Sequence, residues 1–204
     1  MKKIAVLVSG GGTNLQALMD SDIPGGRITA VISSNPGAYA LERARKAAIP
    51  GYVLDRKQYP TDRAYTLALR GLLRELETDL VVLAGFMTIL TPEMVRAFPN
   101  AIINVHPALI PSFCGQGFYG LRVHEQALAR GVKLTGATVH FVSEECDGGP
   151  IIAQKSVAVL PDDTPESLQK RVMEQAEWIL LPRAVGLYCQ NRLEVRGRTV
   201  IIKE

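Results

Sequence analysis

The fold of this chain is decided by a short stretch near its start, Ile4-Ala5-Val6-Leu7-Val8-Ser9-Gly10-Gly11-Gly12-Thr13-Asn14-Leu15. Five apolar residues in a row are typical of a strand buried on both faces of a parallel sheet. A Ser-Gly-Gly-Gly turn follows, and a helical pattern begins directly after it. A buried strand that turns through glycines into a helix is the first unit of a fold in which strands and helices alternate.

The same alternation continues through the first half of the chain. Apolar runs predict strands at Ile4–Val8, Ile28–Ser33, Tyr52–Leu54, Leu80–Ala84 and Ile102–Val105. Helical patterns lie between them at Asn14–Asp20, Ala38–Ala48 and Asp62–Glu77. In the third helix we predict one packing stripe, formed by Ala64, Leu67, Ala68, Leu72 and Leu76. The pattern predicts a doubly wound α/β fold with a mainly parallel, Rossmann-like sheet, whose ligands bind outside the carboxyl ends of the strands.

After Val105 the pattern changes. The segment from Pro107 to Gly120 is rich in proline, glycine and aromatic residues, and long ordered loops of this kind are usually functional. The remaining elements are predicted as a helix at Leu121–Arg130, strands at Thr138–Val142 and Ile151–Val159, a long helix from Pro165 to about Gln190 with Thr164 as its N-cap, and a hairpin of Leu193–Val195 with Thr199–Ile202. We predict a single domain, residues 1–204, that ends in this C-terminal hairpin.

The composition excludes several classes of protein. With 47% hydrophobic and 21% charged residues in 204, the chain has the balance of a globular domain with one sizeable core. The net charge of +3 comes from scattered basic residues, so we expect no nucleic acid as a partner. The first apolar run has five residues, too few for a signal peptide or a membrane span. We therefore expect a cytoplasmic protein with no membrane partner.

The three cysteines, Cys114, Cys146 and Cys189, show no paired spacing. An odd number of cysteines without a Cys-x-x-Cys pattern predicts neither a disulfide framework nor a zinc site. The scattered histidines and cysteines offer no other ligand set, so the sequence predicts no metal. We expect no catalytic role for the three thiols.

Three stretches carry residues suited to chemistry. The first is the glycine turn, whose backbone amides lie at a helix N-terminus and would favour an anion such as a phosphate. It lacks the Lys-Ser/Thr pair of a Walker A loop and the third glycine of the dinucleotide fingerprint. The alternative is a tight strand–helix turn capped by Thr13 or Asn14.

The second stretch is Asn104-Val105-His106-Pro107, at the end of the fifth strand. Alternation puts Asn104 and His106 on one side of the strand, where an amide and an imidazole can donate hydrogen bonds to a developing oxyanion. The alternative is a histidine that is satisfied by nearby backbone.

The third stretch is Gly136-Ala137-Thr138-Val139-His140-Phe141-Val142, followed by an acidic loop that ends in Asp147-Gly148-Gly149-Pro150. An ordinary hairpin turn would explain Asp-Gly, the commonest turn dipeptide, but not the length of this loop between two apolar strands.

Taken together and in order, these stretches and Leu83-Ala84-Gly85-Phe86-Met87-Thr88-Ile89-Leu90 resemble the phosphoribosylglycinamide formyltransferases, a folate-dependent family, over essentially the whole chain. The resemblance implies transfer of a formyl group from 10-formyltetrahydrofolate, as co-substrate, to the amine of glycinamide ribonucleotide. It implies a ribonucleotide phosphate-binding half at residues 1–100 and a catalytic, folate-binding half at residues 101–204. The chain would act on these small molecules as a monomer or homodimer.

The resemblance also assigns residues. The catalytic trio would be Asn104, His106 and Asp147, and the ribonucleotide would contact Gly12, Thr13, Asn14 and Glu177. Reaching Glu177 requires a one-residue insertion in the long helix. The formyl-folate would contact Arg63, Met87, Thr88, Ile89, Leu90, Asn104, Ser143, Glu144, Glu145, Cys146 and Asp147. We expect Asp147 to favour the protonated form of His106, since a carboxylate beside an imidazole stabilises its charged form.

Three alternatives stay open. A formyltetrahydrofolate hydrolase would share the trio but use water as acceptor, and normally carries an additional N-terminal regulatory domain. A methionyl-tRNA formyltransferase would need a C-terminal tRNA-binding domain. A non-catalytic nucleotide-binding module would explain the glycine turn but leave Asn104, His106 and Asp147 without a purpose.

Overall fold

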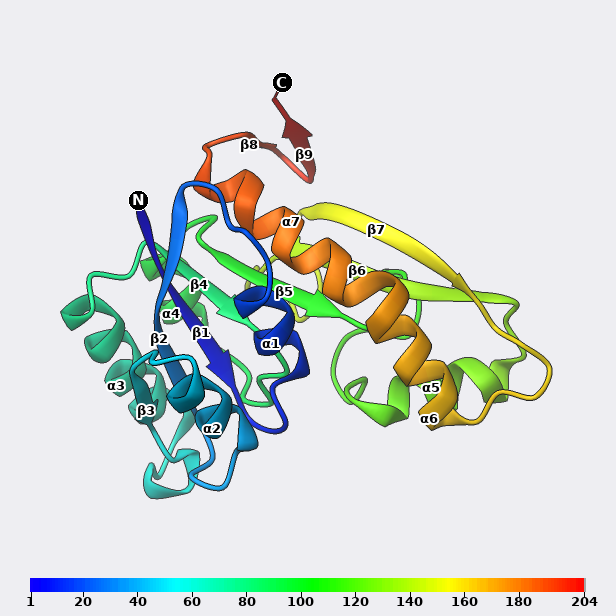
Figure 1. Cartoon of the computed structure of the whole chain (residues 1–204), viewed down its shortest axis with the longest axis horizontal. Coiled ribbons are helices and arrows are strands. Elements are labelled where there is room, and N and C mark those ends of the chain that lie inside the picture. Colours follow the sequence, from blue (N-terminus) through cyan, green and yellow to red (C-terminus); the bar gives the residue numbers. More distant parts are fainter. Residues whose placement is uncertain (204) are drawn as a thin grey trace.

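The computed structural model describes residues 1–203, whose strands form one nine-stranded sheet in the order β3-β2-β1-β4-β5-β6-β7-β9-β8 (Figure 1). The first five strands along the chain pair in parallel, whereas β6 is antiparallel to both β5 and β7. The strands are β1 Lys2–Val8, β2 Gly26–Ser33, β3 Gly51–Val53, β4 Leu80–Leu83, β5 Ile102–His106, β6 Leu134–Phe141, β7 Ile151–Ala158, β8 Leu193–Arg196 and β9 Thr199–Ile202. The predicted α/β fold with a mainly parallel sheet and a C-terminal hairpin is confirmed.

Helices cover both faces of this sheet. They are α1 Thr13–Met19, α2 Tyr39–Lys46, η1 Arg56–Gln58, α3 Asp62–Glu75, α4 Pro92–Ala97, α5 Leu121–Arg130, α6 Pro165–Val172, η2 Met173–Glu177 and α7 Trp178–Cys189. The sequence pattern did not predict η1 or α4, which are only three and six residues long. The short pattern of α4 carries little periodicity, although Pro92 at its first turn is a typical helix start.

The predicted long helix is one continuous rod in Figure 1, but its middle turn, η2, is a π-helix rather than an α-helix. Its N-terminus is capped as predicted, because the Thr164 hydroxyl accepts a hydrogen bond from the Ser167 backbone amide at 3.2 Å. Within residues 1–203 no helix is both long and apolar enough to cross a bilayer.

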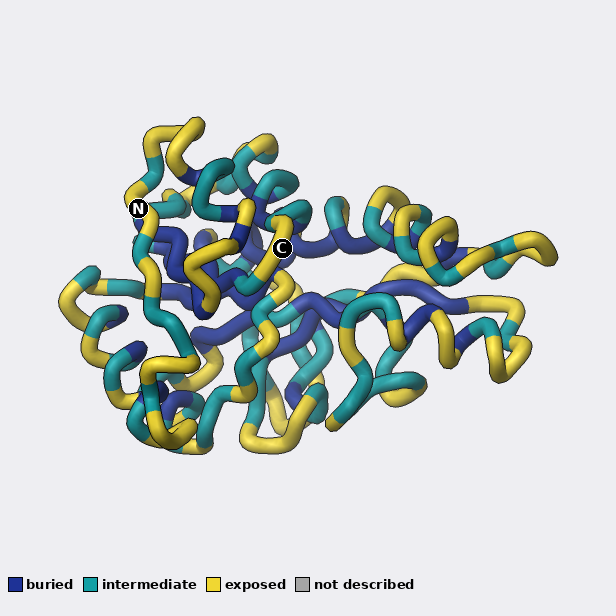
Figure 2. Tube along the Cα trace, turned by 90° about the horizontal axis from the view of Figure 1, so that it is seen from below, coloured by how far each residue is buried: buried dark blue, intermediate teal, exposed yellow. Residues whose placement is uncertain are grey.

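Two hydrophobic cores lie on opposite faces of the sheet. Alternate residues of β1 divide between them, since Val6 packs under α1 and α7 while Leu7 packs under α3. Figure 2 shows the strands as the buried centre of the molecule, with exposed residues on the outer sides of the helices. Burying both faces of the parallel strands is what the unbroken apolar runs of the sequence require.

The packing face of α3 differs from the predicted stripe. Tyr65, Leu69 and Leu73 are fully buried, whereas Leu67 is 45% exposed. Leu72 and Leu76 pack at the edge of the same core, so the stripe was placed correctly only at its C-terminal end. The aromatic ring of Tyr65 has the larger apolar area to bury, and the N-terminal half of the helix buries Tyr65 instead of Leu67.

Candidate active site

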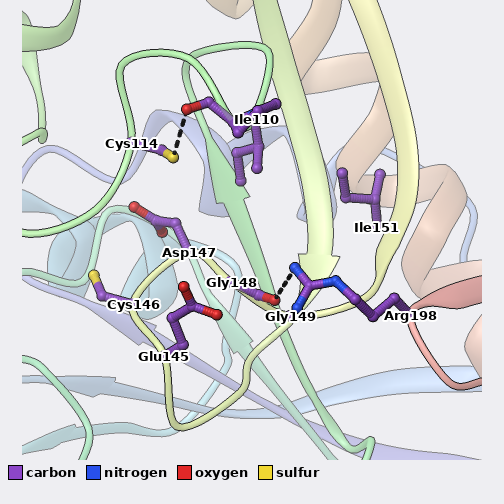
Figure 3. A pocket seen from close by; sticks show the side chains of 10 residues that line it. Ile110, Cys114, Glu145, Cys146, Asp147, Gly148, Gly149, Ile151 and Arg198 are labelled. Carbon is purple, nitrogen blue, oxygen red and sulfur yellow. Dashed lines mark hydrogen bonds between the residues drawn. The ribbon is translucent and has the colours of Figure 1, made fainter.

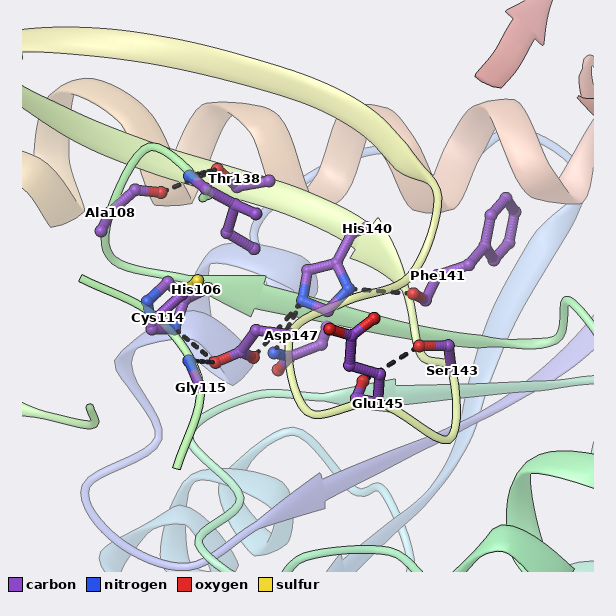
Figure 4. A network of polar contacts seen from close by, with 12 residues as sticks. His106, Ala108, Cys114, Gly115, Thr138, His140, Phe141, Ser143, Glu145 and Asp147 are labelled. Atoms are coloured by element: carbon purple, nitrogen blue, oxygen red, sulfur yellow. Dashed lines mark hydrogen bonds and ion pairs between the residues drawn. The ribbon is translucent and has the colours of Figure 1, made fainter. Parts of the chain in front are cut away.

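Four polar side chains share one face of the β5–β6 ladder. Asn104 pairs directly with His140, and His106 pairs with Thr138. Residues directly opposite on paired strands point to the same face, and so do alternate residues of one strand. The intervening apolar residues of β5 belong to the core on the other face. The sheet therefore concentrates polar groups on the face that the Ser143–Asp147 loop folds across (Figure 4).

His106 is 4% exposed and has a partner for each ring nitrogen. Its Nε2 lies 2.8 Å from the carbonyl oxygen of Phe113, and a carbonyl can only accept, so Nε2 carries a proton. Its Nδ1 lies 3.6 Å from Oδ2 of Asp147.

The pKa of His106 depends on burial as well as on the Asp147 carboxylate, whose effect alone was expected. Burial lowers this pKa below the ordinary value, while the charge of Asp147 and the hydrogen bond to Phe113 raise it less strongly. Asp147 thus acts in the predicted direction, but desolvation outweighs it. The net shift is therefore downward, so burial favours the neutral ring more than Asp147 favours the charged one.

Asp147 reaches His106 from a backbone with φ of 54°, the left-handed region that non-glycine residues rarely adopt. Its Oδ2 accepts a hydrogen bond from the Gly115 amide at 2.8 Å, and its Oδ1 lies 3.7 Å from Nε2 of His140. Burial raises the pKa of Asp147, but the contacts with His140, His106 and Gly115 together lower it below its ordinary value. The carboxylate is therefore ionised at neutral pH.

His140 is a candidate that sequence reasoning missed. It is 1% exposed, and its Nδ1–H donates to the carbonyl of Phe141 at 2.9 Å. Its Nε2 then faces the side-chain amide of Asn104 at 3.2 Å and the Asp147 carboxylate. The ring joins two members of the predicted trio. The signal that finds it is the antiparallel register of β5 and β6, which no local pattern shows.

The glycine turn packs against α2. Gly12 has φ of 73°, and a Cβ added there would lie 2.6 Å from the Cβ of Ala40. Gly11 has open space at the corresponding position. Gly12 is thus required by the close approach of the turn to α2, whatever ligand the turn holds.

A buried polar pair lies directly after the glycine turn. Asn14 Nδ2 donates to Oε2 of Glu177 at 2.7 Å, while Asn14 Oδ1 has no partner in the structure. Glu177 is 5% exposed, and burial raises its pKa to about 7, against the opposing hydrogen bond from Asn14. Buried polar atoms normally have partners, so an unpaired oxygen here suits a ligand or water.

The π-helix η2 explains how Glu177 comes to lie there. A π turn holds more residues than an α turn and often marks a functional position in an otherwise regular helix. The resemblance required one additional residue before Glu177, and η2, Met173–Glu177, is the widened turn at that place. The Thr13 hydroxyl also contacts this turn, donating to Sδ of Met173 at 3.6 Å.

Most of the residues predicted to contact folate lie on the loops that follow β4 and β6, whereas Arg63 lies in α3 and Asn104 in β5. After β4, the side chains of Met87 and Ile89 are more than half exposed, while Thr88 and Leu90 are partly buried. The Met87 amide donates to the Ser9 hydroxyl at 2.9 Å, which ties this segment to the glycine turn.

The acidic loop and Arg63 both contact α4 through ion pairs. The Ser143 hydroxyl donates to the Glu145 carbonyl at 3.0 Å, and Glu144 forms an ion pair with Arg96 of α4 at 2.7 Å. Arg63 lies 3.8 Å from Glu93, also on α4, and its side chain is 76% exposed. Arg63 therefore stands at the rim of this region rather than within the cluster around Asp147.

A cavity of about 160 Å³ lies beside Asp147 (Figure 3). Its walls include Cys114 and Cys146, which burial holds in the thiol form by raising their pKa values. Arg198, in the turn of the C-terminal hairpin, closes one side and donates to the Gly148 carbonyl at 3.1 Å. All three cysteines are unpaired within residues 1–203, and no cluster of three or more His, Cys, Asp or Glu side chains in that range is arranged to hold a metal.

Known proteins share both the sequence pattern and the fold of this chain. The family model of the formyl transferases matches residues 2–185. The phosphoribosylglycinamide formyltransferase of Haemophilus influenzae is 41% identical over 96% of this chain and 91% of its own length. The crystal structure of glycinamide ribonucleotide transformylase 1 from Symbiobacterium toebii superimposes with a TM-score of 0.94 at 43% identity, covering 100% of this chain and 95% of that one.

A formyltetrahydrofolate deformylase from Pseudomonas syringae shares the fold with a TM-score of 0.87, but at 29% identity and over only 66% of that chain. The match to the family model over residues 2–185 defines the chain as a formyl transferase. Within this class, identity near 40% over almost all of both chains is decisive. The chain belongs to the phosphoribosylglycinamide formyltransferase family.

Proposed function

We propose that this protein transfers the formyl group of 10-formyltetrahydrofolate to the amine of glycinamide ribonucleotide, a step of purine synthesis. The observation that carries the proposal is the convergence of Asn104, His106 and Asp147 on one sheet face, in a chain of this family. In such a transfer, two of the three side chains suit charge stabilisation and the third suits proton transfer.

Asn104 and His106 stabilise charge. When the amine attacks the formyl carbon, negative charge develops on the formyl oxygen, and positioned N–H donors lower the barrier. Asn104 offers its amide, and His140 orients that amide from across the ladder. His106 offers a second ring N–H once Nδ1 takes up a proton, because its Nε2–H is already donated to the Phe113 carbonyl. The growing negative charge next to the ring favours its protonation in the transition state, in the same direction as the charge of Asp147.

Asp147 is the group suited to move protons. It is an ionised carboxylate between two imidazoles, 3.6 Å from His106 and 3.7 Å from His140. The attacking nitrogen must lose a proton and the departing folate nitrogen must gain one. A carboxylate fixed by the Gly115 amide accepts such a proton directly or through a water.

The ribonucleotide is assigned to the other end of the site. The backbone of Gly11, Gly12 and Thr13 at the start of α1 suits a phosphate, and the open space beside Gly11 leaves room for it. The unpaired Oδ1 of Asn14 and the carboxyl of Glu177 suit the hydroxyl and amine groups of the same substrate.

The folate is assigned to the loops that follow β4 and β6. The exposed side chains of Met87 and Ile89 suit an aromatic ring system. The Ser143–Asp147 loop supplies backbone polar groups that suit hydrogen bonding to its edge. Arg63, exposed at the rim, suits the anionic tail of a folate.

The test is a product assay on the purified protein. We expect loss of 10-formyltetrahydrofolate only when glycinamide ribonucleotide is present, with one formylated ribonucleotide formed for each folate consumed. Asn104→Leu, which keeps the side chain's size but removes its donors, should reduce turnover by about a hundredfold or more. Formate release without the ribonucleotide would instead identify a hydrolase, and binding without turnover would identify a non-catalytic module.

The proposal includes three statements about the whole chain. Residues 1–100 supply the phosphate site and residues 101–204 the catalytic and folate sites, with Glu177 reaching back to the first half. The protein acts as a monomer or homodimer. The protein is located in the cytoplasm, whose reducing conditions suit its unpaired cysteines. Size-exclusion chromatography and fractionation of cells test the last two statements.

A further inference from the structure

A row of three side chains crosses the sheet beside the catalytic residues. His106 on β5 pairs with Thr138 on β6, and Thr138 pairs with Gln154 on β7. Directly paired residues point to the same face, so Thr138 and Gln154 continue the face that carries His106. Neither Thr138 nor Gln154 has a task in the transfer described above.

The chain leaving β5 folds back over this row and is held there by three hydrogen bonds, while a fourth joins Gln154 to Thr138. The Thr138 hydroxyl donates to the Ala108 carbonyl at 2.7 Å and accepts from the Ile110 amide at 3.1 Å (Figure 4). Gln154 Nε2 donates to the Ile110 carbonyl at 3.0 Å and to the Thr138 hydroxyl at 2.9 Å. These bonds use the one proton and both lone pairs of the hydroxyl and both protons of the amide nitrogen.

The same loop then supplies two backbone groups to the catalytic residues. The Phe113 carbonyl accepts from Nε2 of His106 at 2.8 Å, and the Gly115 amide donates to Asp147 at 2.8 Å. The first fixes the ring orientation of His106, and the second fixes the carboxylate. Both contacts are made within five residues of the segment that Thr138 and Gln154 hold.

We propose that Gln154 is a positioning residue for this formyl transfer: with Thr138 it anchors the start of the Pro111–Gly120 loop, so that Phe113 and Gly115 hold His106 and Asp147 in place. The proposal rests on the proposed function for its kinetic consequence, but not for its structural one. Gln154 is exposed, and its hydrogen-bond partners, Ile110 and Thr138, are assigned to neither substrate. Its loss should therefore lower turnover while leaving substrate affinity largely unchanged.

The experiment compares Gln154→Met and Gln154→Glu with the wild-type chain. Methionine keeps the length of the side chain without its donors, and glutamate places a charged acceptor against the Ile110 carbonyl. We expect kcat to fall by about tenfold to a hundredfold in both, since small misplacements of catalytic groups have effects of that size. KM for either substrate should change by less than about threefold, the pattern of an effect on the transition state rather than on binding. Ser156→Ala, an exposed position two residues along the same strand, is the matched control and should retain wild-type kinetics.

Hydrogen exchange gives a readout that does not depend on activity. The Gly115 amide should exchange faster in Gln154→Met than in the wild type, while amides in the centre of β5 and β6 exchange at unchanged rates. Wild-type exchange at Gly115 together with wild-type kcat would overturn the proposal, and so would a rise in KM without a fall in kcat. A wild-type protein that transfers no formyl group would contradict the proposed function. Faster exchange of the Gly115 amide in Gln154→Met would still support the anchoring role.

Discussion

His106 shows how two opposed effects of one environment decide a protonation state. The Asp147 carboxylate raises the pKa of His106. Burial, which leaves the residue 4% exposed, lowers this pKa by more, so the net shift is downward. The carboxylate nevertheless helps catalysis. In the transition state, the negative charge on the formyl oxygen and the charge of Asp147 both stabilise the protonated form of His106. The resting state and the transition state thus differ in which effect dominates.

Asp147→Asn should reduce kcat by about a hundredfold or more, because it removes the charge that stabilises a protonated His106. The affinity for folate should change much less, since the charge acts mainly in the transition state. An NMR titration should show the His106 pKa falling below its already lowered wild-type value. A His106 pKa that stays unchanged would remove Asp147 from this role.

A double mutant provides the control for this prediction. His106→Ala should cost a similar factor in kcat, and combining it with Asp147→Asn should add little, because the two residues act as a unit. Strictly additive losses in activation free energy would show that the two side chains act independently.

Glu177 links pH to stability. Its pKa rises from 4.5 to about 7 on folding, so between these values the folded chain holds a proton that the unfolded chain has lost. The contribution of Glu177 to the free energy of unfolding is therefore present in full below pH 4.5. It decreases as the pH rises to about 7, by up to about 1.4 kcal/mol per pH unit. Glu177→Gln mimics the protonated side chain and should remove this decrease.

The measurement is urea denaturation of the wild type and Glu177→Gln at several pH values. The variant should gain stability relative to the wild type as pH rises from 5 to 8, while its KM for the ribonucleotide increases. Glu174→Gln, on the exposed side of the same π turn, serves as control and should track the wild type. A constant difference in stability between wild type and Glu177→Gln across this range would contradict a raised pKa.

At the scale of elements, the glycine turn has two separable roles. Because Gly12 is among the residues that the resemblance assigns to the ribonucleotide, Gly12→Val would be the natural probe of phosphate binding. The structure shows that this change would test packing instead, because a Cβ at Gly12 lies 2.6 Å from the Cβ of Ala40 and the backbone has φ of 73°. Gly11 carries neither constraint and is the better probe of the ligand.

Gly11→Ala should raise KM for the ribonucleotide about tenfold, since a methyl group would stand where the phosphate approaches the backbone, and KM for folate should change little. Gly12→Ala should instead lower the midpoint of urea unfolding, by an amount equivalent to about 1–3 kcal/mol. Gly71→Ala, in an open position of α3, should leave both KM values unchanged. Equal increases of both KM values in Gly11→Ala would indicate a purely structural turn.

At the scale of the whole molecule, the three cysteines lie in different surroundings, but we expect none of them to take part in the reaction. Cys114 and Cys146 flank the cavity beside Asp147, and Cys189 lies buried near the end of α7, where burial raises its pKa to about 11. None of these thiols is activated for nucleophilic attack at neutral pH. Replacing all three with alanine should therefore leave most of the activity, as measured by steady-state kinetics.

Alkylation of the wild type tests the same point from the other side. An alkyl group on Cys146 should slow turnover through its bulk beside Asp147, and the triple variant should resist this inhibition. Loss of turnover in a folded Cys146→Ala protein would show instead that this thiol takes part in the reaction.

Much of this molecule follows from the sequence alone. Unbroken apolar runs such as Ile4–Val8 identify buried parallel strands, and Thr164 marks the start of α6, because these signals are local and need no knowledge of distant residues. Four ordered motifs indicated the family, and the alternation along β5 placed Asn104 and His106 on one side. Local periodicity nevertheless misplaced the buried face of α3 at Leu67, since the neighbours of that helix are set by the sheet.

Only the tertiary structure decided the remaining properties of the site. It brought His140 opposite Asn104 through antiparallel register, and it placed Glu177 against Asn14 through the widened turn of η2. It also reversed the expected pKa shift of His106. The physical reason is common to all three: strand register, long-range contact and desolvation depend on groups far apart in the chain. Residue types and their spacing indicate the kind of reaction, but the packed fold determines the protonation states and the geometry of the catalytic residues.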